Sequence, residues 1–276
     1  MNLGGHDIGV CSWSLRSESA DALVEMLGAV GLSHVQLDLR PMIDDETAAA
    51  AVVETLTDAE VEFTAGMIGF PGENYATIGA IHLTGGLVPD DAWPERRVRT
   101  LAAAKLAADI GLPAVTLHVG FIPSSNDPAY KRILDRVADA GAEYARLGVD
   151  LLIETGQEKA PELLRFLNDL NAPNVGVNFD PANMLLYGAG DPIEAVQTLG
   201  RHIRHVHLKD ATLSGRPGVE WGKEKPFGRG GLDVVRFFRG LEDVAYAGPY
   251  VIERESGEDV LADLQDTIVR LQEILE

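Results

Sequence analysis

The sequence predicts a single (β/α)8 TIM barrel that takes up residues 1–276. Short apolar runs alternate with longer amphipathic stretches, and this alternation repeats eight times along the chain. Strictly alternating β and α units indicate a parallel sheet, and eight of them in about 250 residues is the size of a closed barrel. A doubly wound open sheet is the structural alternative, which the number of units and the chain length disfavour.

The first four units have clear helix ends. Their strand-like runs are residues 8–13, 34–39, 61–67 and 113–120, and helical stretches follow at 19–31, 46–59, 93–110 and 128–147. Ser19 is suited to cap the first helix, and Pro94 suits the first turn of the third. Gly31, Gly111 and Gly148 each stand where a helix ends just before the next strand, as helix C-terminal glycines do.

The last four units follow the same order. Strand-like runs at residues 149–155, 175–180, 203–210 and 249–255 alternate with helical stretches at 161–170, 192–199, 232–241 and 260–275. The run 203–210, IRHVHLKD, carries two imidazoles and an ammonium at alternate positions, which share one face of a strand. Its other face is apolar, so the run predicts a strand with one polar and one apolar face.

One connection is out of proportion to the others. Residues 68–92 are Gly-rich and follow the third expected strand, and compact domains rarely contain so long a loop without a purpose. In a closed barrel this loop lies over the carboxyl-terminal mouth. It is interpreted as a lid or a substrate wall, with a surface insertion as the alternative.

Charge and cysteine content exclude several classes of function. The net charge of −20 disfavours nucleic acid or an anionic membrane as the main partner. The one cysteine, Cys11, excludes an intramolecular disulfide and a Cys-based zinc cage, and agrees with a reducing cytosol. No run of 18 apolar residues and no signal-peptide pattern occur, so we expect a cytoplasmic protein with no membrane partner.

Acidic and imidazole side chains stand at the carboxyl ends of four consecutive strands, where a barrel places its active site. These residues are Glu154, Asp180, His207 and Glu253. One carboxylate alone at such a position is commonly a helix cap or a solvated edge, but a barrel brings all four to one point. Three carboxylates there repel one another, and Lys209 supplies only one positive charge. A divalent cation balances them, and the mixed oxygen and nitrogen donors favour Mn²⁺, with Mg²⁺, Co²⁺, Fe²⁺ and Zn²⁺ as alternatives.

Four motifs carry a family resemblance. IETG (153–156), NFDPAN (178–183), HVHLKD (205–210) and YVIERE (250–255), in this order and spacing, resemble the xylose isomerase-like TIM barrel superfamily. Within it the chain is similar to the sugar phosphate isomerase/epimerase group, which includes inosose dehydratase-like proteins and ketose 3-epimerases; IGVCSWSL (8–15) and FGRGGLDV (227–234) also match that group. The resemblance runs from residue 8 to about residue 255 and on into the last helix. It implies that Glu154, Asp180, His207 and Glu253 hold the divalent metal, and that His207 rather than His205 is the ligand.

The resemblance also implies the chemistry. In this group a metal polarises the carbonyl of a ketose and stabilises an enediolate, while two glutamates move the proton. Carried over, Glu154 and Glu253 are the acid/base pair on opposite faces of the substrate. Proton return gives epimerisation or isomerisation of a sugar or sugar phosphate. The alternative is a lyase, by inosose dehydratase-like dehydration or β-elimination from a 3-keto-glycoside, because these reactions share the first step.

Four further residues are candidates for contact with a small carbohydrate substrate: Lys209, His118, Asn183 and Trp13. The alternatives are a surface lysine, a buried structural histidine and, for the tryptophan, core packing. The amide of Asn183 is a poor metal ligand, which argues against a site with several metals. His205 is expected to support the site from one layer deeper. Relatives are often dimers or tetramers, so a homo-oligomer is one alternative, and the oligomeric state stays open.

Two other functional classes compete with a sugar isomerase. An AP endonuclease-like DNA repair enzyme belongs to the same superfamily, but the acidic charge and the few additional ligands argue against it. A sugar-binding barrel without catalysis is disfavoured by the intact set of four residues. Loop 210–230 carries Arg216, Lys223, Lys225 and Arg229, which either bind an anionic group or lie in solvent, so phosphorylation of the substrate stays open.

Overall fold

A computed structural model describes residues 1–276, except for the side chain of Glu46. Eight parallel strands form the barrel: β2 (His6–Cys11), β3 (His34–Asp38), β4 (Glu62–Met67), β5 (Ala114–Leu117), β6 (Asp150–Glu154), β7 (Val175–Phe179), β8 (Ile203–Leu208) and β11 (Tyr250–Ile252). Each strand pairs with the next, β11 pairs with β2, and pairing of β2 with β3 closes the ring. The predicted closed barrel is therefore confirmed, and the open-sheet alternative is excluded.

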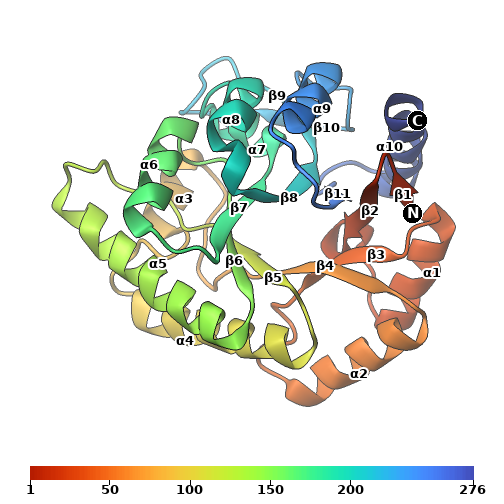
Figure 1. Cartoon of the computed structure of the whole chain (residues 1–276), viewed down its shortest axis with the longest axis horizontal. Coiled ribbons are helices and arrows are strands. Elements are labelled where there is room, and N and C mark those ends of the chain that lie inside the picture. The colour runs from red at the N-terminus through yellow and green to blue at the C-terminus, as the bar shows by residue number, and fades with distance from the viewer.

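Helices surround the strands, as Figure 1 shows. Each barrel unit contributes one of α1 (Ala20–Val30), α2 (Glu46–Asp58), α4 (Trp93–Asp109), α5 (Pro128–Leu147), α6 (Ala160–Leu170), α8 (Pro192–Leu199), α9 (Val234–Asp243) and α10 (Val260–Leu275). The Ser19 hydroxyl accepts a hydrogen bond from the backbone N–H of Ala22, as predicted for the cap of α1. Gly31 and Gly148 end α1 and α5 in the left-handed conformation, with φ of 70° and 74°. These local signals confirm the predicted helix ends.

Several elements were not expected from the sequence. They are β1 (Asn2–Leu3), the 3₁₀ helices η1 (Ser12–Leu15) and η2 (Gly200–His202), α3 (Ile78–Thr84), α7 (Pro181–Tyr187) and the hairpin β9 (Asp210–Thr212) with β10 (Lys223–Lys225). Most of the predicted strands were too long at the carboxyl end because the chain turns there into the mouth. Trp13 lies in η1 rather than in the first strand, and Asp180 caps α7 rather than ending β7.

Loop 68–92 is built around internal hydrogen bonds. The Glu73 carboxylate accepts from the backbone N–H groups of Phe70 and Gly86, and the Arg96 guanidinium donates to the Gly86 carbonyl. Gly86 has φ of 60°, and a Cβ there would lie 2.1 Å from the backbone of Val119. Only glycine fits this close approach. The loop is therefore a packed structure against the barrel, with α3 at its centre.

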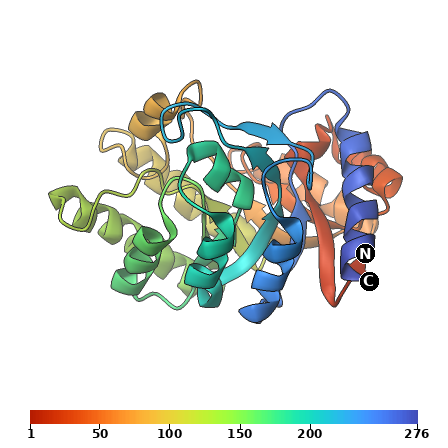
Figure 2. The ribbon, with the colours of Figure 1, turned by 90° about the horizontal axis from the view of Figure 1, so that it is seen from above.

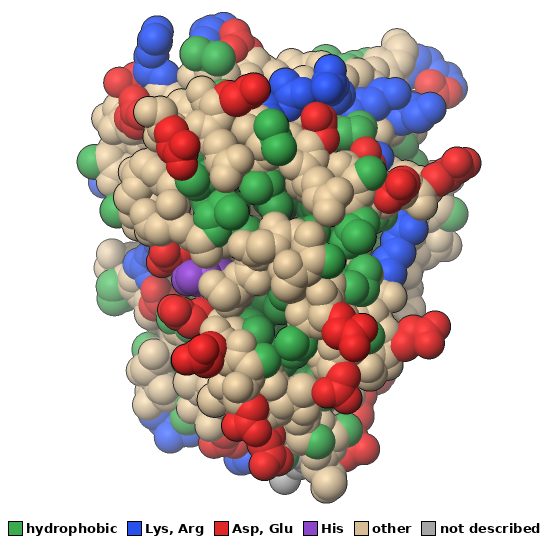
Figure 3. Space-filling model, turned by 90° about the vertical axis from the view of Figure 1, so that its right-hand side faces the viewer, with side chains coloured by type: hydrophobic (Ala, Val, Ile, Leu, Met, Phe, Trp, Pro, Cys, Tyr) green, Lys and Arg blue, Asp and Glu red, His purple; other side chains and the backbone are tan. Residues whose placement is uncertain are grey.

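Of these elements, η1, α3, α7 and the β9–β10 hairpin follow the carboxyl ends of barrel strands and lie at the mouth, where α3 and the hairpin meet (Figure 2). The other two, β1 and η2, lie at the amino-terminal end of the barrel. The two chain termini lie on the same side of the barrel, near α10 (Figures 1 and 2). On the face in Figure 3, acidic side chains are spread among neutral ones, while Lys and Arg side chains gather mainly along the upper edge. Within the described residues, no helix is both long and apolar enough to cross a membrane.

Candidate metal centre

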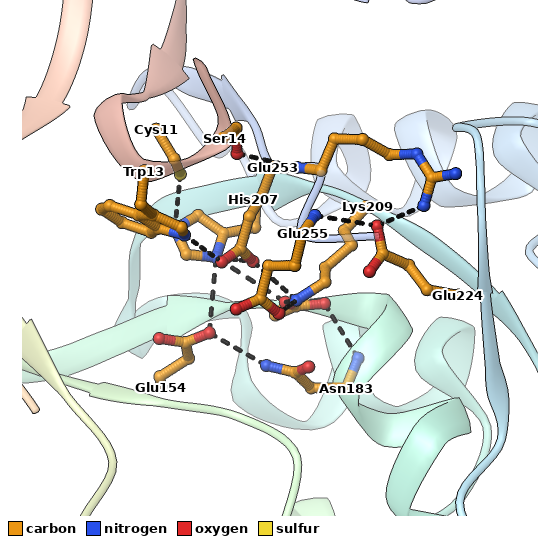
Figure 4. Close-up of polar contacts among 12 residues, drawn as sticks. Cys11, Trp13, Ser14, Glu154, Asn183, His207, Lys209, Glu224, Glu253 and Glu255 are labelled. Atoms are coloured by element: carbon orange, nitrogen blue, oxygen red, sulfur yellow. Dashed lines mark hydrogen bonds and ion pairs between the residues drawn. The ribbon is translucent and has the colours of Figure 1, made fainter. Parts of the chain in front are cut away.

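Four side chains from four adjacent strands meet at the carboxyl end of the barrel (Figure 4). Glu154 is the last residue of β6, Asp180 follows β7, His207 lies in β8 and Glu253 follows β11. One ligand atom of each lies within 4.8 Å of the others, and all four side chains are buried. The structure thus brings together the four residues that the sequence selected.

The imidazole of His207 faces the three carboxylates through Nδ1. This nitrogen lies 3.1 Å from Glu253 Oε2, 3.4 Å from Glu154 Oε1 and 3.6 Å from Asp180 Oδ2. Two carboxylate oxygens of the cluster, Glu154 Oε2 and Asp180 Oδ2, are buried and accept no hydrogen bond. Buried oxygens without donors are costly unless a cation satisfies them. Three carboxylates and one imidazole nitrogen therefore fit a divalent metal ion.

A row of neutral polar side chains holds His207 from the side away from the carboxylates. His207 Nε2 lies 2.6 Å from Gln36 Oε1, and Gln36 donates its own amide to Thr116 Oγ1. Gln36 Oε1 can only accept, so Nε2 carries a proton, and in the neutral ring Nδ1 then has the lone pair that a metal needs. Asn178 lies between the two histidines, and its Oδ1 is 2.8 Å from His205 Nδ1. His205 is therefore a buried support, as the sequence predicted.

Burial and mutual charge shift the pKa values of the cluster. Burial raises the pKa of Asp180 to about 6, although Lys209 and His207 oppose it. Burial acts the same way on Glu253, but Lys209 and His207 outweigh it and hold its pKa well below the ordinary value. Burial lowers the pKa of His207. The acidic groups around the ring, foremost Cys11, Glu253 and Glu154, outweigh this effect, so the pKa is well above the ordinary value. The cluster thus stabilises positive charge at its centre.

Lys209 is buried and ion-paired, so the surface-lysine alternative is wrong. Its Nζ lies 2.9 Å from Glu253 Oε2, 2.6 Å from Glu255 Oε2 and 3.7 Å from Asp180 Oδ2. Burial lowers the pKa of Lys209, but Glu253, Glu255 and Asp180 outweigh this and raise it well above the ordinary value. An ammonium that holds its proton so firmly is suited to donate hydrogen bonds rather than to give up a proton.

A cavity of about 420 Å³ opens beside the cluster. Its lining includes three of the four predicted substrate contacts, His118, Asn183 and Lys209. His118 Nε2 lies 3.7 Å from Glu154 Oε2, and Asn183 donates its amide to Glu154 Oε1 at 2.9 Å. Trp13 is not among the lining residues. Its indole N–H instead donates to Glu253 Oε1 at 2.8 Å, so it positions that carboxylate.

Sequence reasoning missed the residues that hold the ligands in place. Gln36 gave a weak signal, because an amide in the middle of the apolar run 34–39 needs a partner. Glu255 lies two residues after Glu253 in the motif YVIERE, but the sequence predicted no role for it. Glu224 gave no signal; it lies in the hairpin and accepts from the Arg254 side chain and from the backbone N–H of Glu255. Its role depends on a turn that the sequence did not predict.

Comparison with known proteins agrees with the fold. The sequence profile described as "Xylose isomerase-like TIM barrel" matches residues 21–273. L-ribulose-5-phosphate 3-epimerase UlaE of Escherichia coli O157:H7 is 28% identical over 170 residues, which is 59% of this chain and 57% of that enzyme. The chain thus spans little more than half the length of this curated relative.

Solved structures cover the whole chain. A xylose isomerase domain protein from Planctomyces limnophilus is 32% identical, with a TM-score of 0.88 over 99% of this chain and 98% of the other. D-psicose 3-epimerase from Clostridium cellulolyticum H10, solved with D-tagatose, has a TM-score of 0.74 over 98% and 99%, but at 15% identity it shows the fold alone. With the profile match over nearly all of its length, this chain belongs to the xylose isomerase-like TIM barrel family.

Proposed function

We propose that this protein is a divalent-metal-dependent isomerase or epimerase of a sugar or sugar phosphate. The observation that carries the proposal is the buried cluster of three carboxylates and one imidazole beside a cavity. The similarity to a ribulose-phosphate 3-epimerase supports the reaction class. The donor set, three carboxylates and one nitrogen, favours Mn²⁺ over Mg²⁺.

Glu154, Asp180, His207 and Glu253 are the residues that would hold the cation. When bound, it supplies Lewis-acid polarisation of the substrate carbonyl and offsets the negative charge that develops on proton removal. We assign proton transfer at the carbon beside the carbonyl to Glu154 and Glu253. Each is already oriented by neighbours: Asn183 donates to Glu154 Oε1, and Trp13 donates to Glu253 Oε1.

The ion pairs of Lys209 favour an isomerase or epimerase over the lyase alternative. In an elimination, a group near the leaving oxygen must donate a proton. Lys209 lines the cavity, but two carboxylates bind its ammonium and raise its pKa well above the ordinary value. It is therefore a poor proton donor, and we assign it a hydrogen bond to a substrate oxygen. Epimerisation or isomerisation, which needs no leaving group, is favoured.

Hydrogen exchange in D₂O tests the proposal. Protein loaded with Mn²⁺ and incubated with ketoses should exchange the hydrogen beside the carbonyl and give an epimer or isomer, followed by NMR. Loss of a group with a new enone absorbance would instead show a lyase. The Glu253→Gln variant should fold and lose exchange by a factor of about 10²–10⁴. Full exchange in this variant, with Glu220→Gln on the surface as control, would refute the assigned role.

A further inference from the structure

The cations that line the cavity are already neutralised. Among the lining residues these are Arg40 and Lys209. Arg40 forms a two-pronged pair with Asp38, with its Nε and Nη2 each 2.8 Å from a carboxylate oxygen. Lys209 is held between Glu253 and Glu255. A phosphate in this cavity would find no free cationic partner, while carboxylates around it would repel it.

The four cations of loop 210–230 do not supply the missing charge. Within the described part of the chain, none of Arg216, Lys223, Lys225 and Arg229 lines the cavity. Arg216 pairs with Glu220 on the surface, and Arg229 lies 3.4 Å from Asp266. The prediction that this cluster lies in solvent is therefore favoured over an anion site.

The backbone that commonly binds phosphate in such barrels is also occupied. These barrels often hold phosphate on backbone N–H groups of the loops after the seventh and eighth strands. Here the fully buried Asp210 accepts from the N–H groups of Ala211, Gly230 and Leu232, at 2.8, 2.7 and 3.0 Å. A Cβ on Gly230 would lie 2.3 Å from Asp210 Oδ1, so glycine is required there. These N–H groups, in the segment after the seventh barrel strand, already donate to Asp210 and are not free to bind a phosphate.

Aromatic rings form another part of the cavity wall. We call Phe70, Tyr75, Tyr187 and Trp221 the aromatic wall; all four line the cavity. The Tyr187 and Trp221 rings meet edge to face at 4.6 Å, and the Trp221 indole N–H donates to the Tyr75 carbonyl at 3.1 Å. Tyr75 is 46% exposed and makes no side-chain hydrogen bond among the described contacts.

Aromatic faces suit the C–H faces of a sugar ring and offer little to an anion. The wall is also assembled from the mouth segments alone: loop 68–92, α7 and the β9–β10 turn. The cluster of metal ligands and the aromatic wall are therefore two chemically distinct parts of one cavity, one polar and acidic, the other apolar.

We propose that the aromatic wall is a subsite for a second, uncharged ring attached to the reacting sugar. The substrate is then a glycoside or disaccharide of a keto sugar without a phosphate, unlike the phosphorylated substrate named for the ribulose-phosphate relative. This inference rests on the proposed function for its reacting end, but the wall itself follows from cavity residues that do not take part in proton transfer.

A matched set of three ligands tests it. Calorimetry on Mn²⁺-loaded protein would compare D-fructose, D-fructose 6-phosphate and isomaltulose, which carries a glucosyl ring on the same oxygen as the phosphate. Isomaltulose should bind about tenfold more tightly than D-fructose, as expected for one stacked ring, and the phosphate ester no more tightly than D-fructose. Tightest binding of the phosphate ester, or equal binding of isomaltulose and D-fructose, would overturn the proposal.

Variants test whether the preference for isomaltulose over D-fructose arises from the aromatic wall. Trp221→Ala should reduce the preference for isomaltulose over D-fructose to about onefold, and Trp221→Phe should keep part of it. Trp93→Phe, in a tryptophan outside the cavity, should leave the preference as it is. A preference unchanged in both Trp221 variants places the second ring elsewhere and refutes the subsite. Absence of hydrogen exchange with the binding order intact would count against the proposed reaction alone.

Discussion

Gln36 determines which nitrogen of His207 faces the carboxylates. It is fully buried and joins His207 Nε2 to Thr116, so it fixes the tautomer without contacting the substrate cavity. Polar partners of this kind set the orientation and basicity of a metal ligand. The three carboxylates could be selected from the sequence because they stand at strand ends. Gln36 could not, because its partner lies 171 residues away in the chain.

Replacing Gln36 by Met keeps the volume but removes the acceptor for Nε2–H. We expect the affinity for Mn²⁺ to fall about 10–100-fold because the imidazole loses its orientation. Calorimetric titration of metal-free protein would measure it. An unchanged dissociation constant in a folded Gln36→Met variant would show that His207 is oriented by other groups.

Glu158 is a buried carboxyl beside the site that titrates near neutrality. Burial raises its pKa from 4.5 to about 7, although the Ile122 N–H donates to its Oε1 at 2.9 Å. A raised pKa means that the folded state prefers the neutral acid. The stability this gives is fully present below about pH 4.5 and is lost as the pH rises through about 7.

Glu158→Gln removes this loss, because the amide cannot ionise. The difference in free energy of unfolding between the variant and the parent should therefore rise by about 2 kcal/mol from pH 5 to pH 8, in favour of the variant. Urea unfolding at both pH values measures it, and the exposed Glu162→Gln on α6 serves as control. A difference that does not change with pH would mean that Glu158 is ionised throughout the range.

At the scale of elements, the β9–β10 hairpin fixes the segment that carries Glu253. Glu224 of β10 accepts from the Arg254 guanidinium at 2.6 Å and from the backbone N–H groups of Glu255 and Ser256. Both side chains of this ion pair are less than a tenth exposed. Arg254 directly follows Glu253, so the hairpin holds the end of the last strand in place.

Breaking this buried pair should be costly. Glu224→Ala leaves the Arg254 charge less compensated and is expected to lower the free energy of unfolding by about 3 kcal/mol. The exposed pair of Arg216 with Glu220, in the same loop, offers the control: Glu220→Ala should lower the free energy of unfolding far less. Equal effects of the two substitutions in urea unfolding would show that the hairpin does not hold this segment.

The repeating elements were predictable, and the mouth was not. Helices 128–147, 192–199 and 260–275 match α5, α8 and α10 residue for residue, because capping residues and apolar spacing mark both ends locally. The helix α7 was missed because PANMLLY is short and largely buried, without a polar face. The hairpin was missed because its register depends on tertiary contacts that leave no alternation in the sequence.

At the scale of the whole molecule, a chain with a net charge of −20 concentrates three buried carboxylates at one end of its barrel. Lys209 and His207 supply the positive charge that the site carries without a metal, and two carboxylate oxygens still lack a donor. We therefore expect the cluster to be most stable with a cation at its centre. In the proposed function, metal binding and proton transfer both depend on this one cluster.

Hydrogen exchange during a metal titration tests this account most directly. Protein stripped with EDTA would be mixed with a ketose in D₂O, and exchange beside the carbonyl followed by NMR as Mn²⁺ is added. The account predicts no exchange without metal and a rise that saturates near one ion per chain. Exchange that proceeds equally in stripped protein, or never appears with any divalent ion, would contradict it.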